Sequence, residues 1–218
     1  MREPRTPKAA AEAAEAEPRL PAGPGERFAG YWVPALTFAS GHVLGFRRVT
    51  GSSIGPRFTS VWHRYPDGGW TCCMDAQPEH GCPRYFGAGF RRVLRGDIGL
   101  VWDDDDRVTL SVPAARIEWS LRLEPTAATR TVNAGLRLLP AALLRRPAVR
   151  DRAAPLVGRL LDSQPFDLSG TTPLGHASAL ELHRVWEITA AVAVVDGRDI
   201  GPMVVADEPP TIRGAAFP

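Results

Sequence analysis

The chain has 218 residues, a formal net charge of +2, 44% hydrophobic and 23% charged residues. A chain of this length and composition can bury a sizeable core, which excludes global disorder, and its charge gives no sign of a nucleic-acid partner. Because Lys8 is the only lysine among 26 basic residues, no core lysine is present to form a Schiff base with a substrate.

Cysteine content and hydropathy give an expectation for the compartment. The chain has three cysteines, of which two are adjacent, and this pattern does not make a disulfide framework. The N-terminal residues include no apolar signal-peptide core, and no apolar run approaches the roughly 20 residues of a membrane span. We therefore expect a reduced, cytoplasmic protein with no integral membrane segment.

The two ends of the chain differ in composition from the middle. Residues 1–27 are mainly Ala, Glu, Pro and Arg and offer little to bury, so we predict a disordered tail there. A single domain is expected over residues 28–206, followed by an irregular Pro-rich tail at 207–218. Within that domain, residues 36–49 combine closely spaced apolar positions with glycines, which indicates strands rather than a helix.

Two hairpins are predicted from strand-forming runs that are separated by turn residues. Residues 58–65 and 70–74 are rich in β-branched and aromatic types, and the Pro-Asp-Gly-Gly sequence at 66–69 separates them. Proline presets φ at the first turn position, and glycine accepts a positive φ. The second hairpin joins residues 98–102 to 107–112 across four consecutive aspartates.

The remaining chain predicts one more strand, a helical interlude and further strands. Residues 116–124 alternate strictly, and the apolar face consists of Ile117, Trp119, Leu121 and Leu123. The leucines of residues 134–162 are spaced for short helices. Residues 179–195 are again apolar and β-branched, and the Asp-Gly pair at 196–197 predicts a tight hairpin turn.

Many strands with one helical interlude predict a mainly β fold, an antiparallel β-barrel with a helical insertion near residues 134–162. A Trp-rich chain of consecutive hairpins with a late helical insertion resembles the lipocalin-like (calycin-type) barrels of uncharacterised bacterial proteins. The residues at 30–32, Gly-Tyr-Trp, stand only near the place of the Gly-x-Trp opening of that family. The resemblance implies a cavity for a small apolar or amphipathic ligand and assigns no catalytic residue.

The sequence Gly-Phe-Arg-Arg-Val occurs twice, at residues 45–49 and 89–93. One hypothesis is that these are two equivalent strands whose arginines bind a carboxylate or phosphate at the entrance of a cavity. Adjacent residues of a strand point to opposite faces, so one arginine of each pair faces inward, and alternation alone does not decide which. The alternative is two strands with solvent-facing arginines, the commoner arrangement. Our candidate ligand-binding residues are Arg48, Arg92, Trp62, Tyr85 and Glu118.

His63 is the sharpest candidate general base, because it lies on a predicted strand whose partner strand ends at Asp75. A histidine near a carboxylate in a cavity is able to transfer protons without a cofactor. His63 and Asp75 are therefore candidate catalytic residues, with Tyr85 as a possible oxyanion donor. The alternative is a hydrogen-bonded histidine in a half-buried strand, which is more common.

Two groups of residues contain metal-ligating residue types, but neither group has the spacing that a metal site requires. Cys72, Cys73, His80 and Cys82 are ligand types for zinc, but adjacent strand residues point apart and the spacing is not Cys-x-x-Cys. The four aspartates lack the alternating ligands and central glycine of a calcium loop. We predict buried thiols, a solvated turn, and neither a metal nor a cofactor.

Motifs for nucleotide binding, serine hydrolysis and zinc proteolysis are absent from the sequence. Three classes of function remain. The first is a binding protein for a small hydrophobic or amphipathic molecule. The second is a cofactor-independent lyase or isomerase that uses His63, and the third is a protein whose surface mediates assembly, a homodimer being one form of it.

Overall fold

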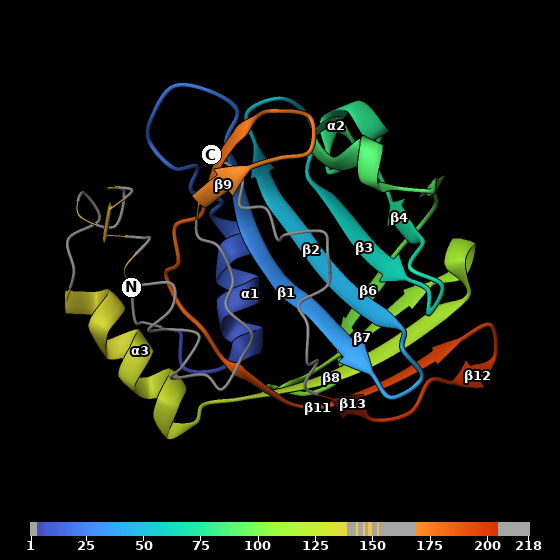
Figure 1. Ribbon diagram of the computed structural model, residues 1–218. Coiled ribbons are helices and arrows are strands. Elements are labelled where there is room, and N and C mark those ends of the chain that lie inside the picture. The colour runs from blue at the N-terminus through green and yellow to red at the C-terminus, as the bar shows by residue number, and fades with distance from the viewer. Residues whose placement is uncertain are drawn as a thin grey trace.

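The computed structural model describes residues 4–138 and 169–204, together with 143, 146, 148, 149 and 152. The described chain is mainly β, with few helices (Figure 1). The six-stranded sheet has the order β13-β1-β2-β3-β4-β5. Its strands are β1 (Phe28–Phe38), β2 (Val43–Ser52), β3 (Phe58–Arg64), β4 (Trp70–Met74), β5 (Arg92–Arg95) and β13 (Met203–Val204).

The second sheet has five strands in the order β12-β11-β8-β7-β6. Its strands are β6 (Gly99–Trp102), β7 (Arg107–Val112), β8 (Ile117–Glu124), β11 (Glu187–Val195) and β12 (Arg198–Asp199). A separate two-stranded ribbon pairs β9 (Ser169–Thr171) with β10 (Ala177–Ala179). Every pairing is antiparallel except that of β4 with β5, which is parallel.

The predicted hairpins are confirmed. Strands β3 and β4 pair across the expected turn, where Gly68 has a φ of +89° and the Tyr65 carbonyl accepts the amide of Gly68. Strands β6 and β7 pair around the aspartates, and Gly197 has a φ of +75° in the turn from β11 to β12. In β8, Ile117, Trp119 and Leu121 are buried, as their alternation predicts.

The two sheets pack face to face on one core, which we call the inter-sheet core. The six-stranded sheet contributes Val33, Phe38, Leu44, Phe46, Val61 and Cys73, and the five-stranded sheet contributes Val108, Leu110, Val112, Ile117, Trp119, Leu121, Ala193 and Val195. On the opposite face of the six-stranded sheet, β2, β3 and β4 are also buried, beneath α2 (Pro83–Phe86) and its flanking turns η1 (Pro78–His80) and η2 (Gly87–Gly89). Both faces of β2, β3 and β4 are therefore interior.

The predicted barrel is not confirmed, because neither sheet closes on itself among the described strands. The chain passes from one sheet to the other at residues 96–98 and again at 200–202, and no strand pairs across either corner. The strands of the two sheets run in different directions (Figure 1). Two sheets at such an angle pack their faces without continuing one hydrogen-bond ladder.

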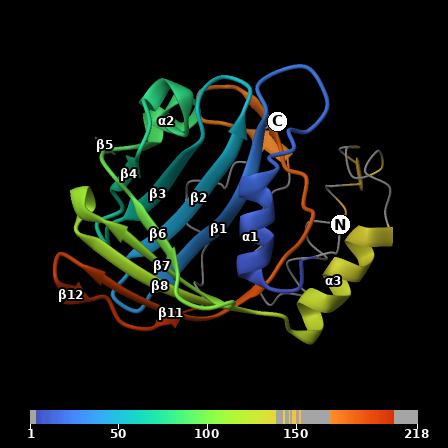
Figure 2. The same ribbon diagram turned by 180° about the vertical axis from the view of Figure 1, so that it is seen from behind.

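The N-terminal segment differs from the expected disordered tail, because Pro7–Ala16 forms helix α1. Thr6 caps this helix by accepting the amide of Ala9, and Pro7 stands in its first turn. The helix lies on the same side of the six-stranded sheet as the five-stranded sheet (Figure 2). The segment lacks an apolar stripe, as the sequence shows, and polar contacts described below hold it instead.

Helix α3 (Ala127–Leu138) begins earlier than the predicted insertion at residues 134–162. Most of that insertion and the predicted tail at 207–218 lie outside the described residues. A short turn, η3 (Pro113–Ala115), connects β7 to β8. No helix in the described part of the chain is long and apolar enough to cross a membrane.

Candidate functional site

One row of side chains crosses the six-stranded sheet at the end where α1 lies. Tyr31 of β1 pairs with Arg48 of β2, and Arg48 pairs with Thr59 of β3. Directly after β4, the Asp75 amide donates to the Thr59 carbonyl. Because pairing partners point to the same face, this row faces α1 beside the inter-sheet core.

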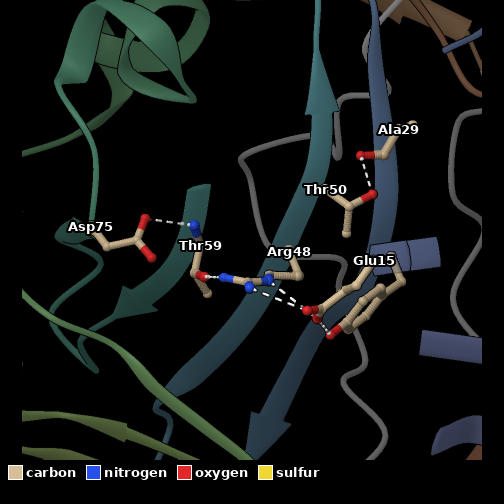
Figure 3. Close-up of polar contacts among 7 residues, drawn as sticks. Glu15, Ala29, Arg48, Thr50, Thr59 and Asp75 are labelled. Carbon is tan, nitrogen blue, oxygen red and sulfur yellow. Dashed lines mark hydrogen bonds and ion pairs between the residues drawn. The ribbon is translucent and has the colours of Figure 1, made fainter. Parts of the chain in front are cut away.

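Arg48 binds a carboxylate that the chain itself supplies. Its Nε and Nη2 donate to the two carboxylate oxygens of Glu15 on α1, both at 3.3 Å, and its Nη1 donates to Thr59 Oγ1 at 2.7 Å (Figure 3). The Tyr31 hydroxyl donates to Glu15 Oε1 at 2.7 Å. Two parallel donors from a guanidinium are the geometry that recognises a carboxylate specifically. The carboxylate that Arg48 binds in this structure is therefore intramolecular, whereas the hypothesis from the sequence has Arg48 bind the carboxylate or phosphate of a ligand.

Thr59 and Asp75 hold Arg48 in place. Asp75 Oδ1 accepts the Thr59 amide at 2.7 Å, and the Thr59 side chain is fully buried. Burial raises the pKa of Glu15, but the hydrogen bonds from Tyr31 and Arg48 outweigh that effect and leave the pKa below its ordinary value. Burial and the neighbouring Glu15 raise the pKa of the Tyr31 hydroxyl above its ordinary value. The cluster is thus a charged carboxylate held by the Arg48 guanidinium and by a Tyr31 hydroxyl that keeps its proton.

The two Gly-Phe-Arg-Arg-Val sequences are not equivalent strands. The first lies in β2, whose faces are both interior, so Arg47 and Arg48 are both partly buried on opposite faces. The Arg47 guanidinium stacks on Trp62, with its Cζ 4.2 Å from the ring centroid. In the second copy Arg91 forms an exposed ion pair with Asp67, and Arg92 begins the parallel strand β5, where it is exposed. The same five-residue sequence therefore lies in two different environments, because the strands that pair with the two copies differ.

His63 is almost fully buried, with 1% of its surface exposed, and its nearest polar partner is another histidine. His42 Nδ1 and His63 Nε2 share a hydrogen bond of 2.7 Å, with the rings stacked at 5.0 Å between centroids. The Tyr65 ring lies 4.1 Å from that of His63. Among the described residues, His63 Nδ1 has no hydrogen-bond partner. Burial first, and then the neighbouring His42, lower the pKa of His63 to about 4, although Asp196 acts in the opposite direction.

The structure does not bring His63 and Asp75 together. Asp75 binds the amide of Thr59, which is four residues from His63 along β3, a separation of roughly 13 Å at the rise of a strand. Tyr85 lies on the other face of the sheet, in the core beneath α2. A proton relay through His63 with Asp75 or Tyr85 thus has no support from their positions.

The other predicted ligand residues are placed separately. Tyr85 is buried, and its hydroxyl donates to Glu26, which also accepts two hydrogen bonds from Arg84. Trp62 is a core residue with edge contacts to Trp70, Phe86 and Phe90. Glu118 is exposed on the outer face of the five-stranded sheet. Of the seven candidate residues, only Arg48 and Asp75 share one hydrogen-bonded network, through Thr59.

The thiols follow the prediction from strand geometry. Cys72 and Cys73 lie in different cores on opposite faces of β4, and all three cysteines are free and buried. Cys82 lies near Ser60 and Arg47, with its Sγ 3.3 Å from Ser60 Oγ. In the part of the chain that the structure describes, no three His, Cys, Asp or Glu side chains are grouped to hold a metal ion.

A cavity of about 430 Å³ lies where the N-terminal segment, α3 and the segment before β11 meet. Its lining includes Pro125 and Asn133, an indole and four guanidinium side chains, and we call it the arginine cavity: Arg5, Arg130, Arg137, Arg184 and Trp186. No Asp or Glu is among the described residues that line it. Arg184 lies with its Cζ 5.5 Å from the Trp186 ring centroid and donates to the Pro4 carbonyl.

Asn133 fixes one wall of the arginine cavity. Its Nδ2 donates to the Val185 carbonyl at 2.8 Å and its Oδ1 accepts the Val185 amide at 2.9 Å, so α3 is tied to the backbone of Val185. Arg184 and Trp186, on the two sides of Val185, both line the cavity. Burial lowers the pKa of Arg184, because its charge is partly removed from water.

Sequence reasoning missed Glu15, His42 and the residues of the arginine cavity. Glu15 belongs to a segment predicted to be disordered, and nothing in its sequence indicates a specific partner. His42 meets His63 only because the β2–β3 register places Leu44 opposite His63. Arg130 and Arg184 are 54 positions apart in numbering, and only the fold brings them to one cavity.

Comparison of the chain with family models, curated proteins and solved structures found no match. The resemblance to lipocalin-like barrels therefore remains a hypothesis.

Proposed function

We propose that the protein binds a small amphipathic anion in the arginine cavity. The observation that carries the proposal is the concentration of four guanidinium groups around one cavity whose described lining contains no carboxylate. Like charges gathered in a concave site raise the local potential and attract a compensating anion. A surface that served only for solubility would alternate the two signs of charge.

The cavity also supports a preference for an apolar or aromatic body beside the anionic group. Trp186 and Pro125 line the wall, and an aromatic face packs well on both rings and guanidinium planes. The volume of about 430 Å³ lies within the range of roughly 300–1,000 Å³ that is typical of small-molecule sites. The hypothesis from the sequence also has an amphipathic ligand bound by arginines, but it names Arg48 and Arg92 at the entrance of a barrel. The site proposed here uses other arginines and lies beside the two sheets.

Two of the four arginines support capture of an external anion most directly. The side chains of Arg5 and Arg130 are exposed, and neither side chain has a hydrogen-bond or ion-pair partner among the described residues. Each charge-assisted hydrogen bond to an anion contributes about 1.5–3 kcal/mol, so losing one such arginine weakens binding about tenfold or more.

The test is calorimetric titration with phenyl phosphate at low ionic strength. We expect saturable binding by the wild-type protein and at least about tenfold weaker binding by Arg130→Gln. The matched control is Arg198→Gln, which removes an exposed arginine of β12 at the other end of the five-stranded sheet (Figure 1). That control should bind as the wild type does.

Two further ligands separate the contribution of the anionic group from that of the aromatic ring. Benzyl alcohol lacks the anion and should not bind, while inorganic phosphate lacks the ring and should bind more weakly than phenyl phosphate. Equal affinities of Arg130→Gln and Arg198→Gln for phenyl phosphate would contradict the proposal. Binding that persists unchanged at high salt would contradict it as well, because exposed guanidinium groups are screened.

A further inference from the structure

Helix α1 is attached to the protein by polar contacts rather than by apolar burial. Of its ten residues, only Pro7 and Ala11 are buried. Among the described residues, its hydrogen bonds to the rest of the chain are made by the Glu15 carboxylate and by the Lys8 amide, which donates to the Asp105 carbonyl at 3.1 Å. An alanine-rich helix of this length is marginal in water on its own. The docked state of α1 therefore depends strongly on the Glu15 contacts.

The hydrogen-bond donors around Glu15 are arranged as in a binding site for a carboxylate. Arg48 offers two parallel donors and Tyr31 offers a third, and Arg48 is held in position by Thr59 independently of α1. Thr59 is held in turn by the neighbouring strand. A donor set that is fixed by the sheet loses little conformational freedom when it binds a ligand.

The surroundings of this donor set are apolar and aromatic. The Tyr31 ring lies 5.9 Å from that of Phe46, and Tyr31 and Trp102 are both partly buried against the inter-sheet core. A carboxylate that carries an aryl or alkyl body would place that body where α1 now lies. Glu15, by contrast, has no aryl or alkyl body beyond its own short side chain, and the helix that carries it is rich in alanine.

We propose that Arg48 and Tyr31, positioned by Thr59, form a second ligand site, specific for small arylalkyl carboxylates, which helix α1 closes with its own Glu15. An external carboxylate competes with Glu15 and releases α1 from the sheet. Because the closed state predominates, the apparent affinity of the site is reduced by the fraction of molecules in which it is open. The site is distinct from the arginine cavity and does not depend on the function proposed there.

The experiment combines calorimetric titration of 4-phenylbutyrate with hydrogen exchange of the α1 amides at neutral pH. Glu15→Gln removes the internal carboxylate, so it should bind 4-phenylbutyrate at least about tenfold more tightly than the wild type and should exchange the α1 amides faster. Glu12→Gln makes the same change at an exposed position of the same helix and should match the wild type in both measurements. In the wild type, saturating 4-phenylbutyrate should accelerate exchange over Pro7–Ala16.

Further variants and one further ligand distinguish this site from the arginine cavity and from nonspecific binding of the phenyl ring. Tyr31→Phe keeps the ring and loses one donor, so it should weaken 4-phenylbutyrate binding in the Glu15→Gln background. Arg130→Gln in the arginine cavity should not affect it, whatever its effect on phenyl phosphate. The alcohol 4-phenylbutanol should not bind. Equal affinities of Glu15→Gln and Glu12→Gln for 4-phenylbutyrate, or binding that leaves α1 exchange unchanged, would overturn the proposal.

Discussion

Acidification should destabilise this protein because the buried His63 is hard to protonate in the folded state. Burial, together with the nearby His42, lowers the pKa of His63 from 6.5 to about 4. Besides His42, the groups that face it are the Tyr65 ring and the Asp196 carboxylate at the turn after β11. His63 is thus harder to protonate in the folded protein than in the unfolded chain. The unfolded chain binds more protons below pH 6.5, so the free energy of unfolding falls as the pH falls.

The size of the effect follows from the two values. Folding stability contributed by neutral His63 is fully present above pH 6.5 and is lost progressively down to about pH 4. Between pH 7 and pH 4 the loss from this group amounts to about 3 kcal/mol, with about half of it already lost near pH 5.5. His42, whose pKa is lowered mainly by burial, acts in the same direction.

The assay is urea unfolding followed by tryptophan fluorescence at half-unit steps from pH 7 to pH 4. In His63→Gln the fall in unfolding free energy over this range should be about 3 kcal/mol smaller than in the wild type. Carboxylates with lowered pKa, such as Glu15 and Glu26, titrate in both proteins and cancel in the difference. His183→Gln, a change at an exposed histidine, should keep the wild-type slope. Parallel curves for wild type and His63→Gln would refute the reasoning.

Two further predictions concern packing. A Cβ at Gly30 would lie 2.0 Å from the Arg48 carbonyl oxygen, so Gly30→Ala should lower the unfolding free energy by about 2 kcal/mol or more, while Gly87→Ala, which meets nothing within 4 Å, should change it by less than about 0.5 kcal/mol. Urea unfolding measures both, and a mild effect at Gly30 would mean that β1 and β2 separate easily there. Burial raises the pKa of Cys73 to about 11 and that of Cys72 well above its ordinary value, and Cys82 is fully buried. Ellman's reagent should therefore modify all three thiols only at the rate of unfolding, and fast modification of the native protein would show that one of them is accessible.

The strands could be predicted from the sequence where turn chemistry and alternation agree. The β3–β4 hairpin has a Pro-Asp-Gly-Gly turn between β-branched runs, and β8 alternates strictly because only one of its faces is buried. These signals are local, since each depends on residues a few positions apart. The parallel strand β5 has no such signal. Along the chain, α2 lies between β4 and β5, so the pairing of these two strands depends on tertiary packing.

The candidate site could be predicted only in part, for a related reason. Alternation tells which residues share a face, and it correctly separates Cys72 from Cys73 and Arg47 from Arg48. It does not tell whether a face is exposed. In β2 both faces are covered, so neither arginine is a simple surface residue. The position of a residue along a strand also matters, and for this reason His63 and Asp75 share a hairpin but lie far apart.

The long separation between paired strands has a consequence during biosynthesis. Glu124 of β8 pairs with Glu187 of β11, and Thr37 of β1 pairs with Val204 of β13. At about 5–20 residues per second, a ribosome needs roughly 3–13 s to synthesise the sixty or so residues between the two strands of the first pair. Throughout that interval, the edge of β8 is present without its partner, and the same edge is then available to a second nascent chain. Aggregation during synthesis should therefore depend on the speed of translation between β8 and β11.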